Sequence, residues 1–280
     1  MVYGAVSLHC TISCQWATLR WATFAPQETL NNFMTSVDLT GQNLPGFDAT
    51  TDYWQATVTE GELAQSPLPP YARSYPARLP DGRYLVLPLR GMPTADGSAP
   101  DRCVASLIAN QASIDVVEQL SLHMAEAAKA HPFDVVVGLP TLGQAFGPLV
   151  AKHLGHSRYV PLGYSRKYWY REELSEPVSS ITTPGKGKLL YVDPNQLALL
   201  AGKRVLVVDD AVSSGTTMVS GLKLLERCGA EVAAIAVAMR QGTQWQAKLR
   251  RADGSAIPVV GAYDCPRMER RADGWWPEAV

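Results

Sequence analysis

The sequence predicts an α/β protein in which helices cover both faces of a mostly parallel sheet. Short apolar runs, of the kind that are buried on both faces of a sheet, recur at 134–138, 204–208 and 231–239. Segments with apolar residues at helical spacing, at 114–130 and 218–228, lie between or beside them. Strand, helix and strand repeated at this spacing are typical of such a sheet.

Other elements give weaker signals. Two apolar runs flank Pro80-Asp81-Gly82 and predict a hairpin over 74–89, because Asp-Gly between apolar runs favours a tight turn. Three further elements are a helix over 146–154 that ends at Gly155 and strands over 158–162 and 189–192. The polar segments 91–100 and 163–188 contain no convincing element. We expect loops there.

Composition excludes some classes of protein. The 280 residues carry 25 basic and 26 acidic side chains, so the net charge of −1 gives no electrostatic reason to expect a nucleic-acid or membrane partner. No run of eighteen apolar residues suggests a membrane span. Five scattered cysteines, an odd number, favour reduced thiols and a cytoplasmic protein. They are Cys10, Cys14, Cys103, Cys228 and Cys265.

The most informative segment follows the apolar strand at 204–208. Asp209 and Asp210 come directly after this strand, and the small-residue loop Ser213-Ser214-Gly215-Thr216-Thr217 then opens a helix. Ligands of open α/β sheets bind at the carboxyl ends of strands. Free backbone N–H groups and hydroxyls at a helix N-terminus suit a phosphate monoester. Each feature alone is usually a helix cap or a solvated turn, but the combination predicts a site for a sugar phosphate and Mg²⁺.

This segment resembles a known family. Val205 to Thr217 is similar to the phosphoribosyl-pyrophosphate motif of type I phosphoribosyltransferases, and a looser resemblance covers residues 113–239. The resemblance implies a Rossmann-like core, Mg²⁺ as cofactor and phosphoribosyl pyrophosphate as co-substrate. It also implies that the two acids contact the ribose hydroxyls, while the following loop binds the 5′-phosphate.

Two other segments fall where the family places pyrophosphate ligands. Pro140-Thr141-Leu142-Gly143 follows the first buried strand and resembles the pyrophosphate loop, which presents backbone N–H groups. Arg166 and Lys167 resemble the basic pair that adenine phosphoribosyltransferases direct at pyrophosphate. Cations there would suit a leaving group that carries several negative charges. The alternatives are an ordinary strand-to-helix turn and a solvated basic turn.

A third segment, 168–188, sits where the family has a mobile catalytic flap. Lys186 and Lys188 within it could reach the phosphates when the flap closes. The resemblance therefore implies catalytic roles for Asp209, Asp210, Lys186 and Lys188, with Asp209 and Asp210 also holding the metal. Residues predicted to bind phosphoribosyl pyrophosphate are Asp209, Asp210, Ala211, Val212, Ser213, Ser214, Gly215, Thr216, Thr217, Pro140, Thr141, Leu142, Gly143, Arg166 and Lys167.

The family usually covers the base with a small hood formed by the chain ends. We predict an N-terminal arm at 1–72, hood elements at 73–110, the core at 111–245 and a C-terminal hood at 246–280. Tyr263, Trp275 and Trp276 either stack on a flat heterocycle or, as is more common for buried aromatics, fill the core of the hood. Family members are commonly dimers, so the resemblance implies a homodimer.

The predicted activity is transfer of phosphoribose to a purine-like base in nucleotide salvage, with release of pyrophosphate. Adenine enzymes of the family have an acidic residue in the flap, but the aligned stretch 179–185 has no carboxylate. General acid–base assistance is therefore unassigned, and a non-purine heterocycle remains an alternative acceptor. A second alternative is a non-catalytic sensor of phosphoribosyl pyrophosphate. A DNA-binding regulator should add a basic helical domain, which the first 110 residues do not indicate.

Overall fold

The structure is a computed structural model that describes residues 51–94, 96, 98–178 and 188–279. Much of the predicted arm, together with Cys10, Cys14 and Lys186, lies outside the described residues. Within them, two five-stranded sheets and a two-stranded sheet carry the fold. No helix of the described residues has the length and apolar character needed to cross a membrane.

The core sheet has the order β10-β9-β8-β4-β5, and every neighbouring pair is parallel. Its strands are β4 (Val135–Gly138), β5 (Val160–Pro161), β8 (Arg204–Val212), β9 (Glu231–Gln241) and β10 (Val259–Cys265). The four residues of β4 and the first five of β8 are almost all apolar and buried, as a sheet covered on both faces requires. The predicted α/β class with a parallel sheet is confirmed.

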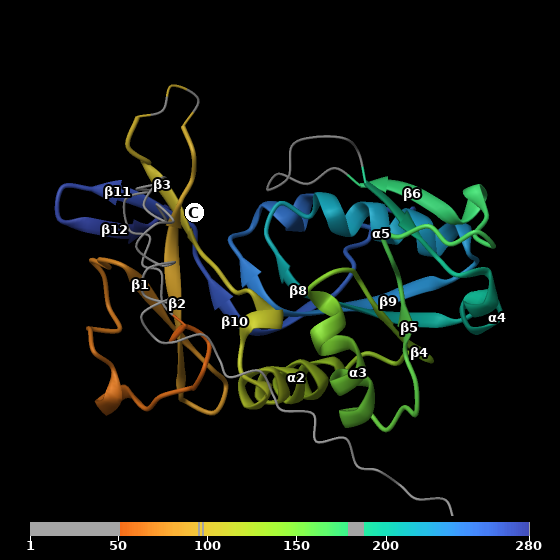
Figure 1. The fold of residues 1–280 in the computed structure, drawn as a ribbon, viewed down its shortest axis with the longest axis horizontal. Coiled ribbons are helices and arrows are strands. Elements are labelled where there is room, and N and C mark those ends of the chain that lie inside the picture. The colour runs from red at the N-terminus through yellow and green to blue at the C-terminus, as the bar shows by residue number, and fades with distance from the viewer. Residues whose placement is uncertain (1–50, 95, 97, 179–187, 280) are drawn as a thin grey trace, which may run out of the picture. The chain divides into compact units, whose positions relative to one another are not determined.

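Helices cover both faces of the core sheet. In Figure 1, α2 (Ile114–Ala128) and α3 (Gly143–His153) lie on one face and α5 (Thr216–Arg227) lies on the other. The Ser113 side chain accepts a hydrogen bond from the Val116 N–H and caps α2, which buries Leu120 and Met124 against the sheet. The core therefore has two hydrophobic layers, one on each side of the strands.

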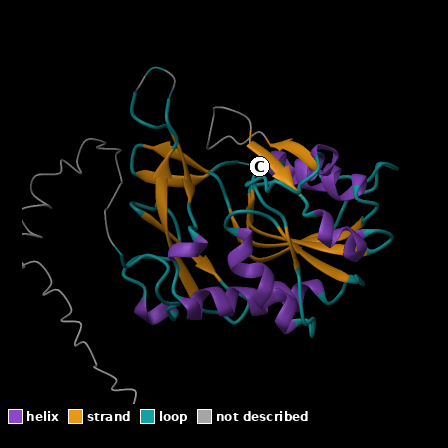
Figure 2. Cartoon of the chain, turned by 45° about the vertical axis from the view of Figure 1, so that its right-hand side comes forward, coloured by secondary structure: helices purple, strands orange, loops and turns teal. Residues whose placement is uncertain are grey.

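The hood sheet is antiparallel and has the order β1-β2-β3-β11-β12. Its strands are β1 (Ser74–Arg78), β2 (Tyr84–Gly91), β3 (Arg102–Ala105), β11 (Met268–Arg271) and β12 (Gly274–Pro277). Figure 2 shows it beside the core sheet. The predicted β1–β2 hairpin is confirmed, and Gly82 in its turn has a φ of 87° that favours glycine. Segments before and after the core thus share one sheet.

The smaller elements complete the described chain. A two-stranded sheet pairs β6 (Ser175–Val178) with β7 (Lys188–Tyr191), and the flap residues between them lie outside the described residues. The short helices are η1 (Glu60–Glu62), η2 (Ala109–Gln111), η3 (Glu172–Leu174), η4 (Pro194–Gln196), α4 (Leu197–Leu200) and η5 (Gln244–Ala247).

Several elements differ from their predicted bounds. β8 runs on to Val212 instead of ending at 208, because the longer β9 continues to pair with it up to Arg240. Helix α3 begins at Gly143, three residues before the prediction. No strand was predicted in the segments that form β3, β6, β10, β11 and β12. The segment 246–280 contributes to both sheets, since β10 pairs with β9 while β11 and β12 belong to the hood.

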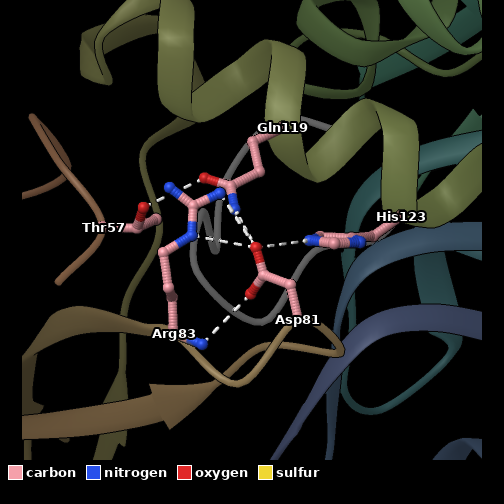
Figure 3. Close-up of polar contacts among 5 residues, drawn as sticks. All are labelled: Thr57, Asp81, Arg83, Gln119 and His123. Carbon is pink, nitrogen blue, oxygen red and sulfur yellow. Dashed lines mark hydrogen bonds and ion pairs between the residues drawn. The ribbon is translucent and has the colours of Figure 1, made fainter. Parts of the chain in front are cut away.

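A polar network joins the hood to helix α2 (Figure 3). Asp81, in the β1–β2 turn, accepts hydrogen bonds from the Arg83 backbone N–H at 3.1 Å and from Gln119 Nε2 at 2.7 Å. Gln119 in turn accepts from Thr57 Oγ1 at 3.0 Å. His123 Nε2 lies 3.8 Å from Asp81 Oδ2. Asp81 therefore has partners from its own hairpin and from α2.

Candidate functional site

Two adjacent aspartates lie in the second half of β8, toward the carboxyl edge of the core sheet. Asp209 is 7% exposed and Asp210 is half-buried. The Asp210 backbone N–H donates to Asp209 Oδ1 at 2.9 Å. The strand was predicted to end before this pair. It continues because Asp209 pairs with Val237 and Ala211 with Met239 on β9, which holds both acids on regular backbone.

The acids are electrostatically unusual. Burial, followed by the charge of Asp210, raises the pKa of the Asp209 carboxyl well above its ordinary value. Burial also raises the pKa of Asp210, against which hydrogen bonds from Asp209 and the local backbone act. A desolvated carboxyl pair gains most from a cation or from hydroxyl donors that a ligand brings. The pair is therefore suited to bind a polyol or a metal-bound sugar.

The loop between β4 and α3 closes on these acids. A methyl group on Gly143 would lie 2.7 Å from Asp209 Cα and 2.8 Å from both Asp209 Oδ1 and the Val208 carbonyl oxygen. Only glycine permits this approach, and the nearby Gly143 backbone N–H acts to lower the pKa of the Asp209 carboxyl. The peptide bond between Pro140 and Thr141 in the same loop is cis. The structure thus brings the predicted pyrophosphate loop against the acid pair.

The predicted phosphate loop leads from β8 into α5. Gly215, the N-cap of α5, has a φ of 76°, in the left-handed region that favours glycine. The side chains of Ser213, Ser214, Thr216 and Thr217 are all partly exposed. No protein acceptor among the described residues takes the backbone N–H groups of Ser214 and Gly215. The loop is therefore open to an anion at a helix N-terminus.

One wall of this loop comes from a segment that sequence reasoning missed. A methyl group on Gly215 would lie 3.3 Å from both Cα and Cβ of Trp245 and 3.7 Å from a methyl carbon of Leu249. Lys248 follows η5, and its Nζ donates to Thr216 Oγ1 at 3.2 Å. No motif marks Lys248 in the sequence. Its position depends on the way η5 packs onto the loop.

The predicted basic residues follow β5, whose carboxyl end lies at the same sheet edge as those of β4 and β8. Arg166 and Lys167 are exposed and have no ion pair or hydrogen bond with described residues through their side chains. Lys188 begins β7, and its Nζ lies 5.3 Å from the centroid of the Tyr164 ring. Of the two predicted flap lysines, only Lys188 can be placed.

Tyr164 is a second residue that sequence reasoning missed. Burial, and then the charges of Asp209 and Asp210, raise the pKa of its hydroxyl. The Tyr164 side chain is therefore near Lys188, and its hydroxyl is close enough to the acid pair for their charges to act on it. A signal that could have found it is its place directly after β5, at the ligand-binding edge of the sheet.

The hood aromatics fill the core. Tyr263 and Trp275 are 4% and 5% exposed and belong to the hydrophobic cluster that joins hood and core. The Tyr263 hydroxyl is buried without a hydrogen-bond partner among the described residues. Trp276 is partly exposed, and the Arg271 guanidinium lies 5.0 Å from its ring centroid. Tyr263, which lies on β10 of the core sheet, and Trp275 on β12 are thus not open stacking platforms in this conformation.

A comparison with known families matches the geometry. The model described as "Phosphoribosyl transferase domain" matches residues 104–257, which is more than half of the chain and contains the acids and both loops. The chain belongs to the phosphoribosyl transferase family. The resemblance stated from the sequence is confirmed.

Curated relatives carry the names of purine enzymes. An adenine phosphoribosyltransferase from a Nocardioides species is 33% identical over 140 residues, which cover 50% of this chain and 72% of the relative. A hypoxanthine/guanine phosphoribosyltransferase from Methanococcus voltae is 33% identical over 121 residues, which cover 43% of this chain and 62% of the relative. These two alignments each cover about half of the present chain or slightly less.

Solved structures of the family are similar at lower identity. The adenine phosphoribosyltransferase of Rhodothermus marinus is 22% identical with a TM-score of 0.46, and the match covers 63% of this chain and 93% of that one. The Trypanosoma brucei adenine enzyme, solved with AMP, pyrophosphate and ribose-5-phosphate, is 19% identical with a TM-score of 0.48. That match covers 63% of this chain and 75% of the other.

Proposed function

We propose that the protein transfers 5-phosphoribose from phosphoribosyl pyrophosphate to a purine-type base and releases pyrophosphate. The observation that carries this proposal is the joint geometry of three elements at one sheet edge. A buried acid pair, an open phosphate loop and the Gly143 loop meet there. The family, and the adenine and hypoxanthine/guanine names of its relatives, support the purine acceptor.

Mg²⁺ fits the donor set at the acids. No group of three or more histidine, cysteine or acidic side chains among the described residues could cage a metal. Mg²⁺ is commonly held by one or two carboxylates, with substrate phosphates and water completing its shell. Asp209 and Asp210 would hold it, and the ion would neutralise charge on the departing pyrophosphate.

The residues then divide the work of one displacement. A ring nitrogen of the base forms a bond to the anomeric carbon as the bond from that carbon to pyrophosphate breaks. Asp209 and Asp210 orient the pentose, and the 213–217 loop fixes the 5′-phosphate. Backbone N–H groups at 140–143, with Arg166 and Lys167, stabilise charge on the leaving group. Lys188 stands at the base of the flap that would exclude water.

The wider organisation is part of the proposal. We place the acceptor beneath the hood sheet, which 73–110 and the β11–β12 hairpin form. We keep 1–72 as an N-terminal arm and 111–245 as the core, to whose sheet β10 is added. A cytoplasmic homodimer agrees with the family resemblance and with the three buried free cysteines among the described residues.

A pyrophosphate-release assay tests the proposal. Protein, phosphoribosyl pyrophosphate and Mg²⁺ are offered adenine, hypoxanthine, guanine and a set of pyrimidines. We expect release with at least one purine and none without a base. Release with a pyrimidine but with no purine would mean that the acceptor is a pyrimidine. Tight binding of phosphoribosyl pyrophosphate with no release on any base would support a sensor instead of an enzyme.

A further inference from the structure

Lys248 is exposed at the rim of the phosphate loop, and its ammonium is not paired with a carboxylate of the described residues. Its Nζ donates to the neutral hydroxyl of Thr216, and no carboxylate of the described residues lies within ion-pair distance of it. Lys129 and Lys152, by contrast, pair with glutamates. A lysine ammonium has three donors, so the hydroxyl leaves Lys248 with capacity for an anion.

The backbone that carries Lys248 is fixed against the phosphate loop. Trp245 and Leu249 flank it and are both buried, and the Ile257 N–H donates to the Leu249 carbonyl oxygen at 3.0 Å. The Trp245 indole N–H donates to the Gly242 carbonyl oxygen at 3.0 Å. Because Gly215 packs directly on Trp245, the lysine stem begins at a set distance from the loop.

Charge is divided along the site. The acids Asp209 and Asp210 stand at the pentose end, while the loop 213–217 contains no acidic residue. Backbone N–H groups at a helix N-terminus supply only partial positive charge. A phosphate monoester with nearly two negative charges would therefore gain from a full cation at this end. Among the described residues, Lys248 is the cation that donates a hydrogen bond to the loop.

We propose that Lys248 binds the 5′-phosphate of the sugar substrate and makes the site selective for a phosphorylated pentose. The proposal rests on the proposed function and adds a ligand to its phosphate end. On binding, Nζ exchanges part of its contact with Thr216 for a phosphoryl oxygen. We place pyrophosphate on the 140–143 loop, on the other side of the acids, and expect no contact between it and Lys248.

Calorimetric titration in the presence of Mg²⁺ tests the assignment with three probes: ribose 5-phosphate, phosphoribosyl pyrophosphate and inorganic pyrophosphate. K248M removes the charge and keeps the stem, and K248R restores a charge. K223M is the matched control. Lys223 is an exposed lysine on α5, the helix that begins at Thr216, and lies about 10 Å further along the helix axis than Thr216.

We expect K248M to raise the Kd of ribose 5-phosphate and of phosphoribosyl pyrophosphate about tenfold, with pyrophosphate binding unchanged. K248R should keep most of the affinity, and K223M all of it. Wild-type affinity in K248M, an equal loss in K223M, or K248R as weak as K248M would each overturn the assignment. If the wild-type protein binds neither sugar phosphate, the proposed function itself fails.

Discussion

Two aspartate sites of this molecule have opposite electrostatics. Burial alone would raise the pKa of Asp81, but hydrogen bonds from Arg83 and the charges of Arg83 and His123 outweigh it and lower the pKa. Burial and the charge of Asp210 raise the pKa of Asp209, with only backbone N–H groups opposing them. The first carboxylate has partners within the protein (Figure 3), and the second has no cationic partner among the described residues.

The difference distinguishes a structural site from the proposed ligand site. Native proteins satisfy nearly all of their buried polar groups, so a buried acid pair without a cation indicates that a ligand supplies the missing partner. The Asp81 network connects the hood to α2, and the Asp81 carboxylate already has hydrogen-bond donors and cationic partners within the protein. The Asp209 pair sits where the core sheet ends and two loops meet.

The largest effect should come from D209N combined with D210N. We expect binding of phosphoribosyl pyrophosphate with Mg²⁺ to weaken at least about a hundredfold, because both ribose contacts and the metal ligands change. The free energy of unfolding should stay the same or rise, since two buried like charges are removed. Calorimetric titration and thermal unfolding measure the two quantities. A double variant that keeps its affinity would remove the acids from the site.

A smaller effect should follow from G143A. The added methyl would overlap Asp209 and the Val208 carbonyl, so the acid or the loop must shift. We expect kcat/KM to fall at least about tenfold and the free energy of unfolding to fall by about 1–3 kcal/mol. G61A is the matched control, because its methyl would meet no atom within 4 Å. Equal activity in both variants would mean that the close approach has no role in catalysis.

Removing the other aspartate should give the reverse pattern. D81A deletes the acceptor of the Arg83 and Gln119 hydrogen bonds, and we expect the free energy of unfolding to fall by about 1–2 kcal/mol. The Kd for phosphoribosyl pyrophosphate should stay within about twofold of wild type. Chemical denaturation and titration of the same sample decide this. A D81A variant of normal stability but poor affinity would contradict the assigned division between the two sites.

The pH dependence of stability gives the most subtle comparison. Because the pKa of Asp209 is raised in the folded state, its contribution to the free energy of unfolding is fully present below the ordinary pKa of 3.8. This contribution is lost as pH rises through the folded-state pKa. D209N with D210N should therefore gain stability relative to wild type as pH rises from the ordinary value of 3.8 through the folded-state pKa of Asp209. The lowered pKa of Asp81 has the opposite sign, so the deficit of D81A should shrink only as pH falls below 3.8. Parallel pH profiles for both variants would refute the electrostatic contrast.

The sequence predicted the strand and the helix start that frame the candidate site, because they lie on one continuous segment. The apolar run at 204–208, the acids and the small-residue loop predicted a strand, a ligand and a helix start in that order. The strand end was predicted too early because aspartate is rare in strands, and only pairing with β9 carries β8 to Val212. Gly143 is a poor helix former, so the sequence likewise gave no signal for the first turn of α3.

Tertiary packing decided what the sequence could not show. Lys248 and Tyr164 belong to polar segments without periodicity, and they reach the site because η5 packs on Gly215 and the loop after β5 folds toward the acids. Strands β3, β11 and β12 are short and carry polar residues, so their pattern is weak until they pair across the hood. Local patterns do not encode contacts between segments that are so far apart.

The central claim is that the turn after β8 binds a sugar phosphate. An experimental structure of the protein with Mg²⁺ and phosphoribosyl pyrophosphate tests it most directly. We predict the 5′-phosphate on the backbone N–H groups of residues 213–217, with the ribose hydroxyls on Asp209 and Asp210. A phosphate bound elsewhere, with this loop closed by protein atoms, would contradict the account.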